Sequence, residues 1–499
     1  MPDFVTKAEL RYLPSQLSLD SRINRSKQVG INRQFDQTRT ERFRRNLNRS
    51  LRGKMTPFKA VSVDYALNVT NDMRADSLIS VSSLKFGPEI DYNQTFGIDV
   101  RPDVATWLRP GYSFSTTYRE NRNPEQQIVG TSPEDRSVNY NNRKSVRSNL
   151  NMDRLLTSAF GRPVSSGSSS EDSTGRSVGS YMYGGMRSFF GILNPVNMTL
   201  SLDKQQTLFG LRTRPVASYR FGFSDDPGVT APSADSTGII SIQQDRQSES
   251  ATFSFDTGVK LFADINLSTR PAWRSAKTVS SNSNIETRSR TWPDAALRWT
   301  PPLRGLETLS RVIRRIDISS GYNRKVDTST NVNLLNANPG LAGGAETKTI
   351  VQSFSPLLQV TLDWAFGLSM RSSYETTKTD QQLGLSSTDQ RLNNRSLTVA
   401  LDYRIQPGFN FFGKKLKGSL NLQTQVIRSS NETLIARDGA TYKPSNGQSQ
   451  LSVRTRSDYQ FSRRIRGGLT VEWTNTENTI TNEKRRIRQG GFWTEFEFN

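Results

Sequence analysis

The sequence contains no cysteine and no histidine among its 499 residues. Without cysteine the chain has no disulfide, no thiol nucleophile and no cysteine zinc site. Without histidine it lacks the commonest general base and metal ligand, which excludes a Ser–His–Asp triad and a His-Glu-x-x-His site. The glycine pairs Gly184-Gly185 and Gly343-Gly344 lack the Lys-Ser/Thr of a phosphate-binding loop. We therefore expect no catalytic residue, no metal ligand, no cofactor and no enzymatic activity.

Long hydrophobic runs are also missing. Hydrophobic residues make up only 33% of the sequence, and no segment of about 18 apolar residues is present, so a transmembrane helix is not expected. A soluble protein of this size would bury too little apolar area to offset its chain entropy. Disorder is one explanation. A membrane β-barrel is another, because half of each of its strands can be polar.

The net charge is +21, from 67 Lys and Arg against 46 Asp and Glu. These basic residues are spread along the chain and do not form one cluster. They can solvate polar strand faces and pair with the acidic residues, or they can bind an anionic partner such as lipopolysaccharide head groups or an acidic protein. Nucleic acid is not an expected partner, because no basic cluster is interleaved with aromatic residues.

Apolar and polar residues alternate in many segments, which indicates strands with two different faces. The runs cover residues 61–70, 96–101, 112–119, 196–202, 253–267, 397–405 and 420–426. The longer ones reach about ten residues or more, the length of a tilted strand that crosses a bilayer, whereas soluble strands have about five or six. The pattern predicts an all-β fold, an antiparallel transmembrane β-barrel of the bacterial outer membrane with long loops and little helix. Alternation alone also fits a soluble sheet whose polar side faces solvent.

The alternation divides the side chains between a water-filled lumen and lipid. The residues predicted to face the lumen are Asp64, Asn68, Asp256, Lys260, Asp402 and Arg404. The residues predicted to face lipid are Val63, Leu67, Phe255, Leu261, Leu401 and Tyr403.

The segments between the runs suggest an organisation along the chain. We expect a basic N-terminal segment with the first strand or strands (1–57), barrel strands (58–160), a Ser/Gly-rich loop (161–180), barrel strands (181–274), a loop-rich segment (275–348) and C-terminal barrel strands (349–499). Within the loop-rich segment, 275–290 is interpreted as a loop and 303–313 as a short surface helix or loop. Tryptophans such as Trp273 and Trp292 fit an interfacial belt or simple strand preference.

The two ends of the sequence differ in their targeting signals. The first 50 residues contain no apolar core of an export signal, so we expect a mature segment, a fragment or the downstream part of a longer chain. In the final strand Phe496 and Phe498 share a face, which resembles the terminal assembly signal of outer-membrane barrels. An ordinary last strand is the alternative.

Four phrases, in this order, resemble the carboxyl-terminal part of the SprA family: Tyr12–Leu19, Thr291–Asp294, Ser353–Leu357 and Phe412–Lys417. That family is the outer-membrane translocon of the type IX secretion and gliding-motility system. The resemblance implies passage of folded cargo proteins through a very wide barrel at the cell surface. It also implies the upstream remainder of the barrel, secreted cargo and plug or lipoprotein subunits as partners. A lipopolysaccharide-insertion barrel, a porin or receptor, and a surface β adhesin remain alternatives.

Overall fold

The computed structural model describes residues 11–31, 39–73, 86–122, 136–160, 192–211, 213–229, 245–261, 264–280, 283–303, 307–333, 345–384, 388–405, 410–411, 414–415, 418–437, 439–461 and 465–496. They form one antiparallel sheet of 19 strands with little helix. The all-β antiparallel prediction is therefore confirmed. No helix among the described residues is both long and apolar enough to cross a membrane.

The strands of the sheet are β1 (Gln16–Ile31), β2 (Arg39–Phe58), β3 (Val61–Asp72), β4 (Glu89–Val100), β5 (Leu108–Asn121), β6 (Arg136–Leu150), β7 (Val196–Leu211), β8 (Arg246–Lys260), β9 (Ile265–Thr269), β10 (Ala272–Ser280), β11 (Ser283–Trp299), β12 (Ile313–Asn333), β13 (Ala345–Trp364), β14 (Leu368–Leu383), β15 (Thr388–Ile405), β18 (Leu420–Arg437), β19 (Lys443–Gln460), β20 (Ile465–Asn478) and β21 (Lys484–Phe496). A separate hairpin contains β16 (Asn410–Phe411) and β17 (Lys414–Lys415). The helices are α2 (Met152–Phe160), α4 (Ala217–Arg220) and α5 (Glu307–Val312).

Apart from β9 and β10, each strand of the sheet pairs with the next one along the chain, so the sheet is a continuous meander. β9 and β10 share one place in it, because both pair with β8 on one side and β11 on the other. The interruption falls at Arg270-Pro271, where proline has no N–H to donate to the ladder. Within the described ranges β1 pairs only with β2 and β21 only with β20, so the sheet has two open edges.

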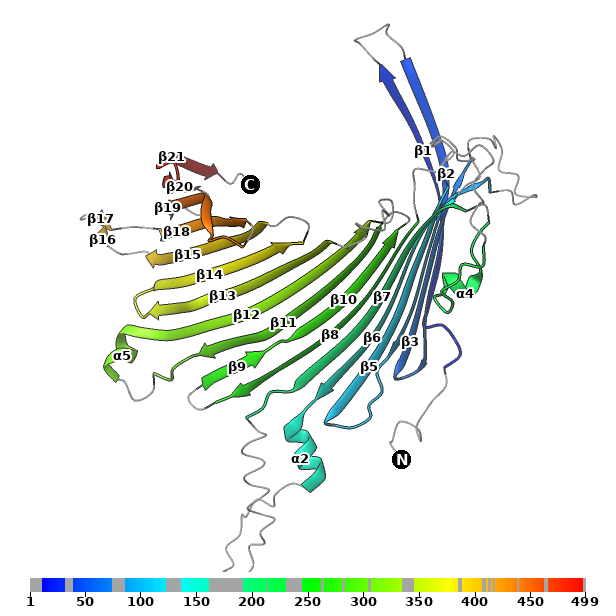
Figure 1. The fold of residues 1–499 in the computed structure, drawn as a ribbon, viewed down its shortest axis with the longest axis horizontal. Helices are drawn as coiled ribbons and strands as arrows, with labels where there is room; N and C mark the ends of the chain where they lie inside the picture. The colour runs from blue at the N-terminus through cyan, green and yellow to red at the C-terminus, as the bar shows by residue number, and fades with distance from the viewer. Residues whose placement is uncertain are drawn as a thin grey trace, which may run out of the picture.

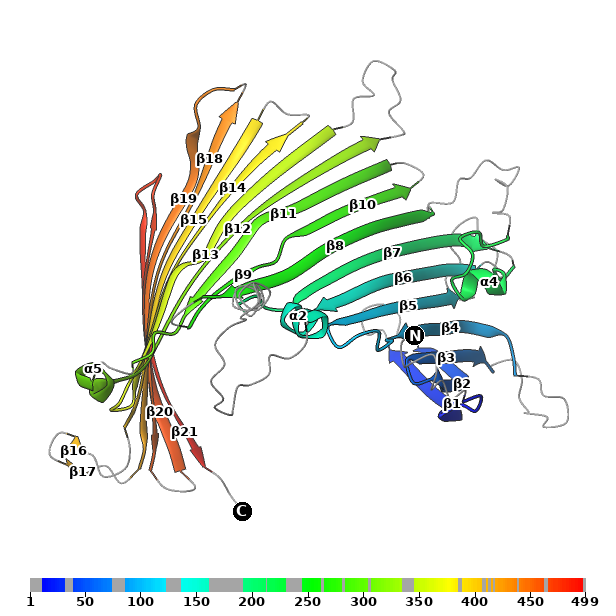
Figure 2. The same cartoon turned by 90° about the horizontal axis from the view of Figure 1, so that it is seen from below.

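The sheet curves into an arch (Figures 1 and 2). Its convex face is turned toward the viewer in Figure 1, and α4 lies outside the arch in both views. Because neighbouring strands are antiparallel, alternate connections lie at the same end of the sheet. One end, here named the loop end, carries the long connections 73–88, 122–135, 212–245 and 334–344. The other end, the turn end, has the short connections 59–60, 261–264 and 365–367, together with the longer 151–195 and 406–419.

Many strands are longer than a membrane is thick. β12 has 21 residues, and at about 3.4 Å per residue it extends roughly 70 Å. The hydrocarbon core of a bilayer is about 30 Å thick. Even with a strong tilt such a strand continues well beyond the hydrocarbon.

The structure corrects the prediction that 275–348 is rich in loops. Residues 275–280 belong to β10 and 283–290 to β11, and the two strands pair with each other from Ala272 and Thr291 to Val279 and Asn284. The prediction was wrong because these strand portions carry polar side chains on both faces, so the apolar–polar alternation disappears although the strands continue. The helix expected near 303–313 is present as α5.

A second departure is α2, which ends the segment 58–160 that was predicted to contain only strands. Asn151 precedes this helix, and its Oδ1 accepts the backbone N–H of Arg154 at 3.0 Å. Asparagine at this position is a favoured N-terminal cap, so the sequence did carry a local signal for the helix. The predicted loop 161–180 lies outside the described residues.

Candidate functional site: the two faces of the arch

Ladder partners in a sheet point to the same face, which allows the two faces to be followed from strand to strand. Tyr118 and Tyr140 face each other across β5 and β6, and both rings contact Tyr219 of α4, which lies outside the arch. Their face is therefore the convex one. The register carries this assignment through β4 to Leu67 of β3 and, on the other side, through β7 to Gln247 of β8.

The same register places all six residues predicted to face a lumen on the concave side. They are Asp64 and Asn68 in β3, Asp256 and Lys260 in β8, and Asp402 and Arg404 in β15. Five of the six residues predicted to face lipid are on the convex side, namely Val63, Leu67, Phe255, Leu401 and Tyr403. Leu261 lies one residue beyond β8, where no ladder partner assigns it to a face. Which solvent each face meets stays a prediction.

The concave face is polar along the whole length of its strands. Cross-strand and same-strand ion pairs recur on it: Arg119–Asp91, Arg143–Asp203, Lys325–Asp327 and Arg456–Asp458, at 3.3, 3.4, 2.8 and 2.9 Å. Beside Asp402, Gln423 donates a hydrogen bond to its carboxylate at 3.0 Å. Such groups require water or each other as partners. The concave side is therefore built to remain hydrated.

The convex face carries an apolar belt on its turn-end half. In β15 the belt consists of Leu397, Val399, Leu401, Tyr403 and Ile405. Apolar residues continue it in the neighbouring strands, for example Val360 and Leu362 in β13 and Leu469 and Val471 in β20. Leu469 and Val471 are 50% and 47% exposed. A monomeric protein in water rarely exposes a continuous apolar surface of this extent.

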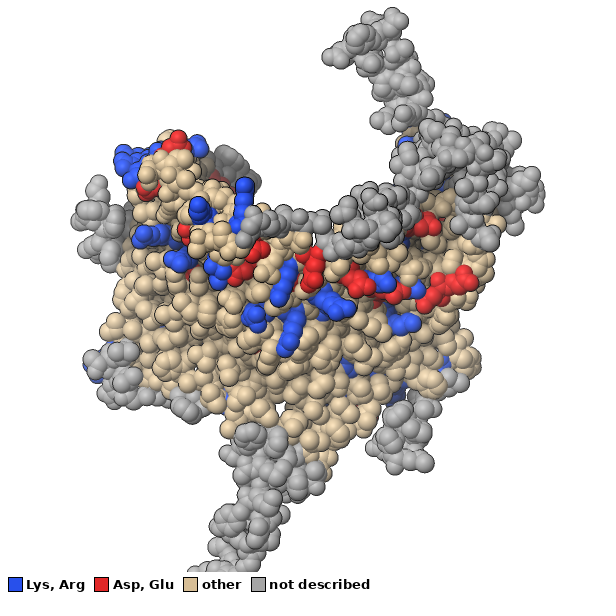
Figure 3. Space-filling view, in the orientation of Figure 1, with Lys and Arg blue, Asp and Glu red and all other residues tan. Residues whose placement is uncertain are grey.

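Charged residues begin where the apolar belt ends, on the loop-end half of the convex face. Figure 3 shows them as a row of blue and red across the arch, above a surface with few charges. They include the ion pairs Lys204–Glu249 at 3.3 Å and Arg391–Asp380 at 2.5 Å. This division of one face into an apolar and a charged half is typical of strands that pass from hydrocarbon into a polar phase.

A segment between β7 and β8 folds back over the convex face of β4 to β7, and we name residues 213–229 the strap. The ring of Tyr219 stacks on Tyr140 at 4.4 Å and meets the edge of Tyr118 at 6.4 Å. Phe221 and Phe223 of the strap pack against Phe96 at 5.3 and 5.8 Å. Tyr118, Tyr140 and Tyr219 are completely buried. The strap and the strands beneath it thus form a buried hydrophobic core in the described chain.

An ionic network fixes the strap to the sheet. The guanidinium of Arg214 donates to Glu120 at 2.8 Å and to Glu89 at 2.6 Å, and it lies 4.2 Å above the ring of Tyr92. Arg136 pairs with Glu120 as well, and the Tyr118 hydroxyl donates to the same carboxylate at 2.9 Å. Burial alone would lower the pKa of Arg214, but its hydrogen bonds to Glu120 and Glu89 outweigh that effect and raise the pKa.

The strap also satisfies polar groups that would otherwise face outward. Asn142 donates to the carbonyl of Gly222 at 3.0 Å, and the Tyr219 hydroxyl donates to Gln206 at 2.8 Å. Burial raises the pKa of the Tyr219 phenol, which favours its neutral, hydrogen-bonding form. Gly222 has φ +79°, and a Cβ there would lie 2.2 Å from Thr116 Oγ1. Only glycine fits this close approach.

Sequence reasoning did not detect the strap. Its turn at Asp225-Asp226-Pro227-Gly228 is recognisable, and Asp226 accepts the backbone N–H of Gly228 at 2.9 Å. The aromatic residues Tyr219, Phe221 and Phe223 alternate next to that turn and were a further signal. Their partners, however, lie about a hundred residues away in β4 and β5, and a single sequence does not reveal such pairings.

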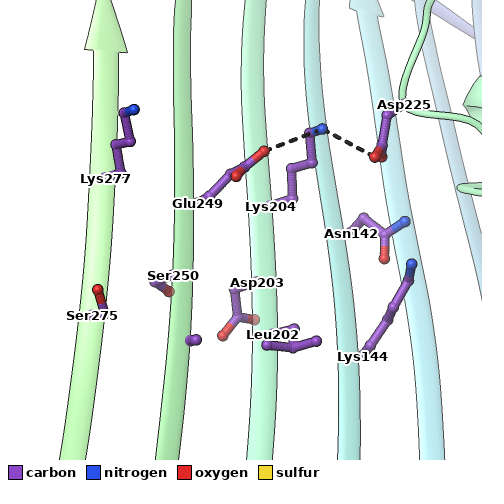
Figure 4. A pocket seen from close by; sticks show the side chains of 11 residues that line it. Asn142, Lys144, Leu202, Asp203, Lys204, Asp225, Glu249, Ser250, Ser275 and Lys277 are labelled. Carbon is purple, nitrogen blue, oxygen red and sulfur yellow. Dashed lines mark ion pairs between the residues drawn. The ribbon is translucent and has the colours of Figure 1, made fainter. Parts of the chain in front are cut away.

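Two further depressions lie on the convex face, the first at the edge of the strap. The first, of about 370 Å³, runs from β6 to β10, and Figure 4 shows Lys204 within it between Glu249 and Asp225. Lys204 is 3.3 Å from both carboxylates, so its charge is neutralised inside the protein. The second, of about 900 Å³, is lined by Trp273, Trp292, Arg288, Arg290 and Arg324 among others.

The described residues offer no metal site, since no group of three or more acidic side chains is arranged to hold an ion in this part of the chain. Of the residues proposed as a terminal assembly signal, Phe496 ends β21 opposite Ile465, and Phe498 lies outside the described ranges.

No family model matches the sequence, and no curated protein does. Several solved structures resemble the chain at low similarity. For the copper transporter OprC the identity is 9% and the TM-score 0.40, over 96% of this chain and 65% of that one. For the alcaligin outer-membrane receptor FauA of Bordetella pertussis the values are 8% and 0.35, over 91% and 71%. For BauA, the ferric preacinetobactin receptor of Acinetobacter baumannii, they are 8% and 0.29, over 98% and 74%. The chain spans about two thirds of the length of the copper transporter.

Proposed function

We propose that the chain forms a section of the wall of a wide transport barrel in the bacterial outer membrane and has no catalytic role. One observation carries this proposal: the arch has a continuous apolar belt on its convex face and ionic side chains along its concave face. Two such faces suit hydrocarbon outside and water inside. A soluble adhesin would leave the belt in contact with water, at a cost of about 25 cal/mol for each Å².

The width of the arch favours large cargo. In the described residues its 19 strands occupy 18 places side by side, since β9 and β10 share one, and no closure is formed there. Barrel diameter grows with strand number. The resemblance of four sequence phrases to the SprA family adds a specific cargo class, namely secreted proteins that pass in a folded state. We take protein export as the first form of the function. A receptor or porin for small solutes is the second, because a polar concave face serves either one.

The two open edges of the sheet, β1 and β21, suggest that further strands pair with it. A strand edge in hydrocarbon leaves its backbone N–H and C=O groups without partners, which costs several kcal/mol for each group. We propose that β1 and β21 pair with further strands, such as an upstream part of the same barrel. Cysteines at Ser18 or Asp20 of β1 and at Gln489 of β21, all on the concave face, test this arrangement. Efficient disulfide formation between the two edges would instead favour closure of the sheet on itself.

Single-cysteine labelling tests the orientation, and the absence of native cysteine makes every label specific. In cells, Asp402→Cys should react with a membrane-impermeant maleimide, whereas Leu401→Cys should react only after detergent is added. A hydrophobic fluorophore at position 401 should be quenched by brominated lipid, and the same fluorophore at 402 should not. If both positions react alike with the maleimide, the membrane assignment is wrong.

The cargo is tested by removing the protein from its host. If it exports proteins, secreted proteins should accumulate in the periplasm of the depleted cells, while the uptake of small solutes stays normal. A receptor or porin predicts the reverse, with normal secretion and slower uptake. The Asp402→Cys variant should restore the lost process, and a bulky maleimide adduct at position 402 should reduce it again.

A further inference from the structure

The larger depression on the convex face joins an aromatic surface to a basic one. In this depression Phe253 stacks on Trp273 at 5.8 Å, and Trp292 is 43% exposed. Arg288 and Arg290 of β11 and Arg324 of β12 also line it. Arg290 is the direct ladder partner of both Trp273 and Val326. The boundary between the apolar belt and the charged half of the face therefore crosses this one depression.

The three guanidinium groups have little negative charge around them. Arg288 makes the only ion pair of the three within the described ranges, to Glu286 at 3.9 Å, and Glu286 is shared with Lys277 at 4.0 Å. Arg290 and Arg324 form no ion pair inside the part of the chain that the structure describes, and the Nε of Arg324 is buried there without a hydrogen-bond partner. This excess of positive charge is complementary to an anion from outside the protein.

The side chains of the depression and its position on the convex face indicate which kind of anion it binds. Arginine pairs in a bidentate manner with phosphate, and tryptophan prefers the head-group level of a membrane. Four long connections lie at the loop end, and in outer-membrane barrels the end with long loops faces outward. In that orientation the depression, at the loop-end limit of the apolar belt, lies at the level of the outer leaflet, whose glycolipid carries phosphate groups above its acyl chains.

We infer that this depression binds the phosphate-bearing glycolipid of the outer leaflet, with its phosphates on Arg290 and Arg324 and its acyl chains on Trp273 and Phe253. The inference rests on the proposed outer-membrane function. It identifies a lateral lipid site on the convex face, separate from the transport path along the concave face.

The test compares the wild-type chain with the double variant R290Q/R324Q, both extracted from outer membranes in mild detergent. The probes are bisphosphorylated lipid A and lipid A whose phosphates have been removed, each immobilised on beads. The wild type should bind the bisphosphorylated form. R290Q/R324Q should bind it at least about tenfold more weakly, because two charge-assisted contacts are lost. Removing the phosphates should weaken binding of the wild type to a similar level.

Arg371 provides a matched control, because it is an exposed arginine of β14 on the concave face without an ion pair in the described chain. The variant R371Q should bind lipid A like the wild type. Equal binding by R290Q/R324Q and the wild type would overturn the inference, and so would an equal loss in R371Q. Full competition by millimolar inorganic phosphate would also overturn it, because the site would then recognise a simple anion and not a lipid. Heat-modifiable migration in gels checks the folding of each variant.

Failure of this inference is distinguishable from failure of the proposed function. If lipid A binding does not depend on Arg290 and Arg324 while positions 401 and 402 still label as expected, only the lipid site is wrong. If the labelling of 401 and 402 also fails, the membrane orientation is wrong, and the lipid site with it.

Discussion

The strap-covered surface over β4 to β7 and the open depression over β8 to β12 are both on the convex face, and both place arginines beside aromatic rings. They differ in the source of the negative charge. Under the strap, Arg214 and Arg136 meet Glu120 and Glu89 of the same chain. In the open depression, Arg290 and Arg324 meet no described carboxylate. Arginine therefore stabilises the fold under the strap, whereas in the open depression it remains available for an external partner.

The two regions also differ in how their polar groups avoid hydrocarbon. The strap covers Gln94, Thr116 and Asn142, which are outward-facing polar residues that bare lipid would not satisfy. At the same distance from the loop end, β13 to β15 also carry polar and charged residues, such as Gln352, Lys378 and Asn393, and no strap covers them. A protein segment thus covers the polar surface of β4 to β7, whereas the polar surface of β13 to β15 stays open. The predictions below test this division, beginning with the largest expected effect.

Glu120→Gln should produce the largest loss, because it leaves Arg214 and Arg136 partly buried without their shared carboxylate. The side chain of Glu120 is only 4% exposed, and breaking a buried ion pair from one side costs about 3–5 kcal/mol. We expect the strap to detach and trypsin to cleave after Arg220. The control Asp99→Asn breaks the exposed pair with Arg101 and should cost less than about 1 kcal/mol. If Glu120→Gln resists the protease as well as the wild type does, the ionic network does not hold the strap in place.

Leu401→Arg examines the uncovered part of the convex face, where lipid and not a strap is expected. An arginine there should cost about 2–4 kcal/mol if the site lies near the middle of the membrane. Asp402→Arg, one residue away on the concave face, should cost far less, since water can solvate it. Urea titration of the protein folded in lipid vesicles measures both values. Similar midpoints for the two variants would contradict the assignment of the faces.

Gly222→Ala tests whether the close approach of the strap to the sheet is needed. The added Cβ would lie 2.2 Å from Thr116 Oγ1 at a residue with φ +79°, and such strain costs on the order of 1–3 kcal/mol. The variant should loosen the strap and raise hydrogen exchange at Phe221 and Phe223. Gly491→Ala in β21 is the control, since nothing lies within 4 Å of its added Cβ. A strap that exchanges no faster in Gly222→Ala than in the control would show that the approach is not needed.

The sequence allowed prediction of the sheet where its two faces differ and not where they are alike. Leu397 to Ile405 alternate strictly with polar neighbours, so β15 and its orientation were recognisable. Arg288 and Arg290 alternate only with Ser and Thr, so the loop-end part of β11 resembled a loop. The strap was hidden for another reason: its contacts join Arg214 to Glu89 and Glu120 across 125 and 94 residues. Such a pairing depends on the register of the folded sheet and not on any local pattern.

Tyr219→Phe should give the smallest effect, because it removes a single oxygen atom under the strap. It is also the most specific test of the difference between the covered and the open convex surface. The hydroxyl of Tyr219 donates to Gln206 at 2.8 Å, and both side chains are buried. Loss of this bond should cost about 1–2 kcal/mol, since Gln206 Oε1 then lacks a donor. Tyr112→Phe, on the uncovered convex face and 39% exposed, should stay within about 0.5 kcal/mol of wild type. Urea titration in lipid vesicles compares the two variants. If they lose the same small amount, the strap confers no special protection on the polar groups beneath it, and the contrast between covered and open surface reduces to the ion pairs alone.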